Sequence, residues 1–123
     1  MQNQSVKFKA DLKVRSYNFA LNMVRFLERL PADGITRELT RQLIRSATSI
    51  GANVIEAQAS SSKKDFTNFF SYALKSANET KFWLGLLRDT NRSPRPVVET
   101  LLKEATELSN ILGASILTLR GKR

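Results

Sequence analysis

The chain has 123 residues, which fits one domain and leaves little room for a second. It carries 20 Lys and Arg residues against 11 Asp and Glu residues, and the net charge of +9 favours polyanionic partners, although it is also compatible with plain solubility. Because Cys and His are absent, disulfides and thiol chemistry are excluded, and no metal site or cofactor is expected. No signal sequence is evident and no apolar run approaches the roughly 20 residues of a membrane span, so we expect a cytoplasmic protein.

Short breaks divide the chain into four helical segments. Pro31 and Gly34 end the first segment, a run of serines from Ser60 ends the second, and Asn91 with Pro94 separates the third from the fourth. Such short connections favour antiparallel neighbours. The sequence therefore predicts a single all-α domain over residues 1–123, an antiparallel up-down-up-down four-helix bundle with helices at about residues 11–30, 35–59, 63–88 and 94–119.

The second segment has two opposite faces. Its apolar residues recur at steps of three and four and form one stripe, made of Leu39, Leu43, Ala47, Ile50, Val54 and Ala57. Arg37, Arg41 and Arg45 follow an i, i+4, i+8 spacing, which places them nearly opposite that stripe. Gly51 costs about 1 kcal/mol of helix stability relative to Ala, and it is predicted to let another helix approach closely.

The first and third segments carry more apolar surface than one core needs. In the first, the predicted core stripe is Tyr17, Ala20, Leu21, Val24 and Leu27, and the residues predicted on another side include Phe19, Met23 and Phe26. In the third, the predicted core stripe is Phe66, Phe69, Phe70, Ala73, Ala77, Leu84 and Leu87, and the other side holds Tyr72, Phe82, Trp83 and Leu86. A helix of a small monomer hides one such stripe, so the second sides are predicted to form an interface between copies. Scattered surface apolar residues, which are common, are the alternative.

The sequence offers no catalytic constellation. Nucleophile–base pairs need an activating base, usually His, and the glycines are isolated rather than grouped in a phosphate-binding loop. Glu56 and Glu79 could meet across the bundle as paired carboxylates, or each could pair with a nearby cation or amide such as Lys81 or Asn53. We therefore expect that the protein is not an enzyme.

Basic residues carry the functional signal. Lys63 and Lys64 begin the third segment, where they oppose the helix dipole, and a bound anion would relieve this cost. Arg binds phosphate with two parallel hydrogen bonds, so the arginines of the second segment are predicted to contact nucleic acid. Further cations cluster at the third break and at the end of the chain, namely Arg88, Arg92, Arg95, Arg120, Lys122 and Arg123. The alternative is a solvated face, in which Glu38 and Glu56 neutralise part of the charge.

Several stretches are distinctive as an ordered set. They are residues 39–57 (LTRQLIRSATSIGANVIEA), residues 62–66 (SKKDF) and residues 73–80 (ALKSANET), followed by Trp83 and Leu84. This set resembles the four-helix-bundle family of 23S rRNA-intervening-sequence proteins, and the similarity extends over nearly the whole chain. The family pattern often reads Ala-Glu-Gly at the positions where this chain has Ile55, Glu56 and Ala57, so the end of that helix can differ slightly.

The resemblance implies an antiparallel bundle that assembles into a homopentameric ring. Members are encoded in insertions within bacterial large-subunit rRNA genes or as free-standing genes, and RNA binding has been proposed for them. The accessory variability determinants of diversity-generating retroelements are similar, and they are basic pentamers that bind a reverse transcriptase and nucleic acid.

Two functional hypotheses follow. In the first, a non-enzymatic homo-oligomer binds RNA, or nucleic acid generally, through phosphate contacts made by Arg37, Arg41, Arg45, Lys63 and Lys64. In the second, the basic surface is a scaffold that binds a reverse transcriptase or another acidic protein.

Overall fold

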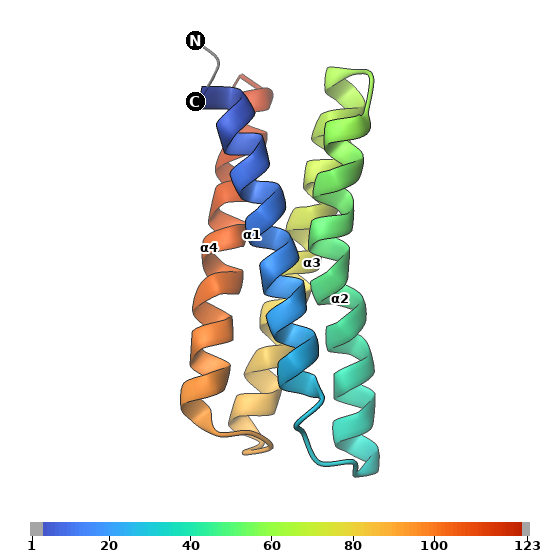
Figure 1. Ribbon diagram of the computed structural model, residues 1–123, viewed down its shortest axis with the longest axis vertical. Helices are drawn as coiled ribbons and strands as arrows, with labels where there is room; N and C mark the ends of the chain where they lie inside the picture. Colours follow the sequence, from blue (N-terminus) through green and yellow to red (C-terminus); the bar gives the residue numbers. More distant parts are fainter. Residues whose placement is uncertain (1–3, 122–123) are drawn as a thin grey trace.

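The computed structural model describes residues 4–121, with side chains from residue 11 to residue 121. Over this range the chain forms four α-helices and no strand: α1 (Gln4–Leu27), α2 (Gly34–Ala59), α3 (Lys63–Asp89) and α4 (Arg95–Leu119). Each helix runs opposite to the one before it (Figure 1), so the predicted all-α four-helix bundle is confirmed for one copy of the chain. None of these four helices is long and apolar enough to cross a membrane.

The helix boundaries agree with the prediction to within one residue for α2, α3 and α4. α1 differs at both ends, because it begins at Gln4 and ends at Leu27. No glycine or proline interrupts residues 4–10, so nothing stops the helix from extending toward the N-terminus. At the other end, the N–H of Arg29 donates to the Phe26 carbonyl at 3.1 Å and that of Leu30 to the Leu27 carbonyl at 3.2 Å. This tighter turn ends α1 three residues early.

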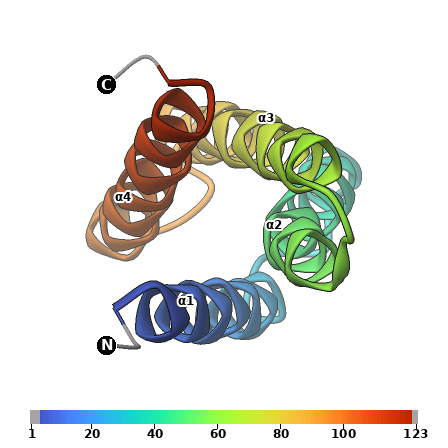
Figure 2. The same ribbon diagram turned by 90° about the horizontal axis from the view of Figure 1, so that it is seen from above.

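The four helices follow one another around the bundle, and the seam between α1 and α4 is the loosest (Figure 2). α2 and α3 pack extensively, as do α3 and α4, whereas α1 and α4 share few contacts. Arg15 of α1 spans this seam: its Nε and Nη2 donate to the two oxygens of Glu104 at 2.7 and 2.9 Å, and it also pairs with Glu107. The hydrogen bond to Glu104 is the largest cause of a raised pKa at Arg15, so this guanidinium is a permanent cation.

The predicted core stripes of α2 and α3 are confirmed. On α2 all six predicted residues are buried. On α3 the buried residues are Phe70, Ala73, Ala77, Leu84 and Leu87, and Phe66 and Phe69 are partly buried against the core. Gly51 is buried against Ser16 of α1, so the predicted close approach of a second helix is confirmed.

The predicted core face of α1 is wrong except at Leu27, which is 6% exposed and belongs to the core. Phe19, Met23 and Phe26 were predicted to lie in an interface between copies, but they are 2%, 0% and 8% exposed and belong to the core, whereas Tyr17 is 63% exposed. The inward stripe advances by alternating steps of four and three residues, through Leu12, Ser16, Phe19, Met23 and Phe26. Ser16 conceals this stripe in the sequence because it is polar, although it is fully buried. Phe19, Met23 and Phe26 therefore offer no surface for an interface in this fold.

Two loops meet at the end of the bundle where α2 begins. Asp33 caps α2 by accepting hydrogen bonds from the Thr36 backbone N–H at 3.0 Å and the Thr36 hydroxyl at 2.8 Å, which together lower the pKa of its carboxyl. Asn91 has a φ of 56°, and this left-handed residue ends α3 and sets the direction of the next loop. Arg92 in that loop donates to Asp33 Oδ1 at 3.0 Å and to Thr36 Oγ1 at 2.9 Å. Arg92 therefore joins two loops within the protein.

Candidate functional site

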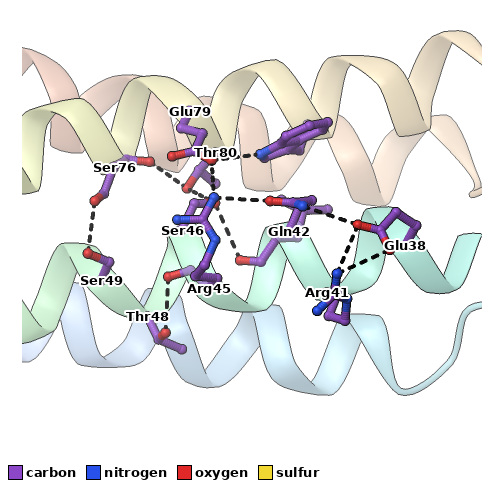
Figure 3. A network of polar contacts seen from close by, with 12 residues as sticks. Glu38, Arg41, Gln42, Arg45, Ser46, Thr48, Ser49, Ser76, Glu79 and Thr80 are labelled. Atoms are coloured by element: carbon purple, nitrogen blue, oxygen red, sulfur yellow. Dashed lines mark hydrogen bonds and ion pairs between the residues drawn. The ribbon is translucent and has the colours of Figure 1, made fainter.

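The arginines of α2 lie on its outer face, as predicted. Arg37, Arg41 and Arg45 are all exposed, because a step of four residues returns to the same side of a helix and the opposite side is held in the core. Each of the three guanidinium groups nevertheless has a partner within the protein. Figure 3 shows these partners for Arg41 and Arg45.

The first two of these arginines, Arg37 and Arg41, each bond to an oxygen of the protein, which is a carboxylate oxygen in the case of Arg41. Arg37 donates to the Ala32 carbonyl at 2.8 Å. Arg41 pairs with Glu38 at 3.2 Å, and the Gln42 amide donates to the same carboxylate at 3.2 Å (Figure 3). The hydrogen bonds from Gln42 and then from Arg41 lower the pKa of Glu38, which therefore stays ionised beside Arg41.

Arg45 belongs to a network that joins α2 to α3. It pairs with Glu79 of α3 and donates to the Gln42 side chain at 3.0 Å (Figure 3). The same Glu79 oxygen accepts a hydrogen bond from the Trp83 indole nitrogen at 3.2 Å. The carboxylate is thus held by a cation from the neighbouring helix, and the pairing with Glu56 considered from the sequence does not form, since Glu56 is exposed on α2.

Two hydroxyl pairs lie beside this network, and the residue pattern alone did not reveal them. Thr80 donates to Ser46 at 2.9 Å, and Ser76 donates to Ser49 at 2.9 Å, so each pair joins α3 to α2 (Figure 3). The available signal is a pair of small hydroxyl residues three or four positions apart on each helix, next to core positions. Small side chains at these positions allow α2 and α3 to approach closely while every hydroxyl keeps a partner.

Lys63 and Lys64 occupy the first turn of α3, and both are exposed. Ser62 caps this helix by accepting a hydrogen bond from the Asp65 backbone N–H at 3.0 Å. Neither ammonium group has an ion pair or a hydrogen bond with any described residue. Leu119 near the end of α4 lines the same shallow depression as Lys63, so the end of α4 lies beside the start of α3.

The remaining predicted cations divide into two groups. Around the third loop, Arg88 pairs with Asp89 at 2.9 Å, and both Arg88 and Arg95 approach Glu99 at 3.5 Å. At the end of the chain, Arg120 is exposed, and Lys122 and Arg123 lie outside the described residues. Among the described side chains, the cations that make neither an ion pair nor a hydrogen bond are Lys13, Arg25, Arg29, Lys63, Lys64, Lys75, Lys103 and Arg120.

The predicted second side of α3 does lie at the surface. Tyr72, Phe82 and Leu86 are 51%, 59% and 36% exposed. Trp83 is partly buried against the core, and the Phe82 ring meets it edge to face with ring centroids 5.0 Å apart. The exposed apolar surface of α3 therefore consists of Tyr72, Phe82 and Leu86. Trp83 packs beneath Phe82, between this surface and the core.

The described side chains offer charge recognition more clearly than any other chemistry. Within residues 11–121, no three potential metal-ligating side chains of Asp, Glu, His or Cys gather in one place. What the surface does present is a set of unpaired ammonium and guanidinium groups, a type of group that pairs with anions in proteins.

Comparisons with known proteins agree with this architecture. The family model for the 23S rRNA-intervening sequence protein matches residues 9–114. A solved structure from Bacteroides thetaiotaomicron VPI-5482, described as a protein with unknown function from the S23 ribosomal protein family, is 35% identical with a TM-score of 0.79, and the match covers 85% of this chain and 97% of that one. The comparison with curated proteins found no match. The chain therefore belongs to the 23S rRNA-intervening sequence protein family.

Proposed function

We propose that this protein binds RNA or another nucleic acid through phosphate contacts centred on Lys63 and Lys64, a role that places it in the bacterial cytoplasm. The observation that supports this is the exposure of both ammonium groups in the first turn of α3, without an acidic partner among the described residues. The N-terminus of the helix adds positive potential at the same place. The net charge of +9 and the name of the family favour the same class of ligand.

The arginines of α2 have a secondary part in this proposal. A phosphate that binds Arg41 or Arg45 must compete with the carboxylate of Glu38 or Glu79. Its binding there therefore adds less to the affinity for nucleic acid than binding to an unpaired cation does. A guanidinium group has five N–H donors, so Arg41 and Arg45 can still contact a nucleic acid that the lysines have bound.

The test compares two double variants of equal charge change. We expect Lys63→Gln with Lys64→Gln to weaken RNA binding about tenfold at low salt and to reduce the slope of log K against log salt by about 2. Arg41→Gln with Arg45→Gln should have a smaller effect on both quantities, because these cations are already paired. Filter binding of a labelled RNA duplex over a series of KCl concentrations measures both. An absence of binding at low salt, or an affinity that does not depend on salt, would refute the proposal.

We also propose that the protein self-associates through the exposed apolar surface of α3, formed by Tyr72, Phe82 and Leu86. At 100° per residue these three positions fall within about 80° of one another around the helix, so they share one side of α3, on which Lys75 and Glu79 also lie. A closed ring of copies, five in the assembly implied by the family resemblance, would repeat the lysines of each subunit. Repeated weak phosphate contacts gain affinity through effective concentration.

Native mass measured by sedimentation tests this surface. We expect the wild-type protein to have a mass several times that of the 13.9 kDa chain, and Phe82→Glu with Leu86→Glu to reduce it to that of one chain. Val14→Glu with Tyr17→Glu is the matched control, because both are exposed apolar residues on α1 and the charge change is the same. A wild-type protein that sediments as one chain contradicts self-association, and an equal effect of the control variant contradicts the assignment to α3.

A further inference from the structure

A groove lies between α1 and α4 at the end of the bundle where α1 finishes and α4 begins. Its volume is about 740 Å³, and its lining residues come from both sides of the loose seam between these two helices. The end of α1 and the turn that follows it contribute one wall, and the first turns of α4 with the preceding loop contribute the other. The other neighbouring helices pack more closely, so the bundle leaves room for a further element at this seam.

The floor of the groove is apolar and continuous with the core. Phe26 and Leu101 are core residues that also line the groove, and Leu30 packs partly buried beside them. Val97 is 45% exposed on the α4 wall. A concave apolar surface of this kind is suited to the apolar side chains of a partner.

The α1 wall of the groove is cationic. In the described part of the chain, the charged side chains that line the groove are Arg25, in the last turn of α1, and Arg29, in the turn that follows this helix. Both guanidinium groups are exposed, and neither makes an ion pair or a hydrogen bond with a described residue. Glu28, the acid next to Arg29 in the sequence, does not line the groove. An apolar floor therefore lies beside a wall of positive charge that nothing in the described chain neutralises.

Elsewhere along the same seam, an arginine of α1 is neutralised by two acidic residues of α4. Earlier on α1, Arg15 holds Glu104 and Glu107, two carboxylates that lie about one turn apart on the facing helix. At the level of the groove, α4 offers no equivalent, because Glu99 is directed to Arg88 and Arg95. The arginines of the groove are thus placed as Arg15 is, but without the facing carboxylates.

We propose that this groove binds an amphipathic helix of a protein partner. Its apolar side chains cover the floor, and two carboxylates one helical turn apart pair with Arg25 and Arg29. A helix presents an apolar stripe and a bordering row of acids at this spacing. Nucleic acid supplies the negative charge but no aliphatic surface for the floor, and the surface proposed above for contacts between copies lies on α3, which does not line this groove. A helix with both apolar and acidic residues matches both features.

The first experiment selects helical peptides against the purified full chain. The displayed library has a fixed apolar stripe of Leu and random residues along both borders of that stripe. The expected result is enrichment of Asp or Glu at two positions one turn apart on one border. Enrichment of neutral or basic residues, or no enrichment at all, overturns the proposal.

Binding of the selected peptide is then measured by fluorescence anisotropy. Arg25→Gln with Arg29→Gln is expected to raise the Kd at least about tenfold, through the loss of two charge-assisted contacts. Lys63→Gln with Lys64→Gln removes equal charge elsewhere and is expected to leave the Kd unchanged. Equal weakening by both pairs means that binding follows net charge alone, and this overturns the proposal. Loss of RNA binding with intact peptide binding in the lysine variant separates this inference from the proposed function.

Other occupants are tested at Val97. The chain has no Cys, so Val97→Cys accepts a single environment-sensitive dye. Its emission is expected to shift to shorter wavelength with the selected peptide and not with a scrambled peptide of the same composition. Val97→Glu, which keeps the helix content, is expected to abolish peptide binding. A fall in native mass in Val97→Glu identifies a second copy in the groove, and displacement of the peptide by an RNA duplex identifies a nucleic acid, and either result overturns the proposal.

Discussion

Replacing Phe19 with Ala is expected to lower the free energy of unfolding by about 3–5 kcal/mol. Phe19 is almost fully buried on the inward face of α1, so truncation removes its apolar contacts and leaves a cavity that the neighbouring helices can fill only in part. Urea unfolding followed by the circular dichroism of the helices measures the change as a shift of the midpoint at constant m-value.

Tyr17→Ala is the control for Phe19→Ala, because it removes a ring of similar size from the exposed side of the same helix. Its effect on the free energy of unfolding is expected to stay within about 0.5 kcal/mol. Both variants are compared with the wild type at one protein concentration, so that self-association contributes equally. If Tyr17→Ala lowered the free energy of unfolding more than Phe19→Ala, the side of α1 that contains Tyr17 would face the core, as the sequence pattern indicated.

A second large effect is expected where α1 crosses α2. Gly51→Val is expected to lower the free energy of unfolding by about 1–3 kcal/mol, because a bulky side chain would be forced against the backbone of α1. A Cβ atom at residue 51 would lie 3.4 Å from the Ser16 Cβ and 3.6 Å from the Ser16 carbonyl carbon and oxygen. The Cβ of Ala fits at the 3.4 Å distance, which is a close but acceptable contact. The additional methyl groups of Val would meet backbone atoms of α1, which cannot move aside easily.

Gly51→Ala is the matched control at this crossing. It is expected to leave the free energy of unfolding unchanged or to raise it by up to about 1 kcal/mol, the difference in helix propensity between Gly and Ala. Thermal and urea unfolding of the two variants give the comparison. A Val variant as stable as the Ala variant would show that the two helices are further apart than the 3.4 Å contact implies.

The contrast between α2 and α1 shows what a single sequence can predict. The apolar residues of α2 keep an unbroken spacing of three and four, so its inward face follows from periodicity alone. In α1 the buried Ser16 interrupts the inward stripe, and Tyr17 begins a competing stripe on another side. Aromatic residues occur on both stripes, so only the packing of the other helices decides which stripe is inward.

The sequence predicted where the arginines of the candidate site lie, but not all of the side chains with which they pair. The helical period places Arg41 and Arg45 on the outer face, and Glu38 lies close enough along the same helix to be anticipated. Glu79 lies on α3, and its meeting with Arg45 depends on how far α2 and α3 are shifted along each other. The groove between α1 and α4 could not be predicted for a similar reason, because periodicity describes each helix separately and contains no information on how two helices diverge.

Trp83 is the one tryptophan of the chain, and its indole shares a carboxylate oxygen of Glu79 with Arg45. Any anion that draws Arg45 away alters the electric field across the indole ring, to which the energy of its emission responds. The molecule thus contains its own optical reporter, without a label, on the polar face that joins α2 and α3.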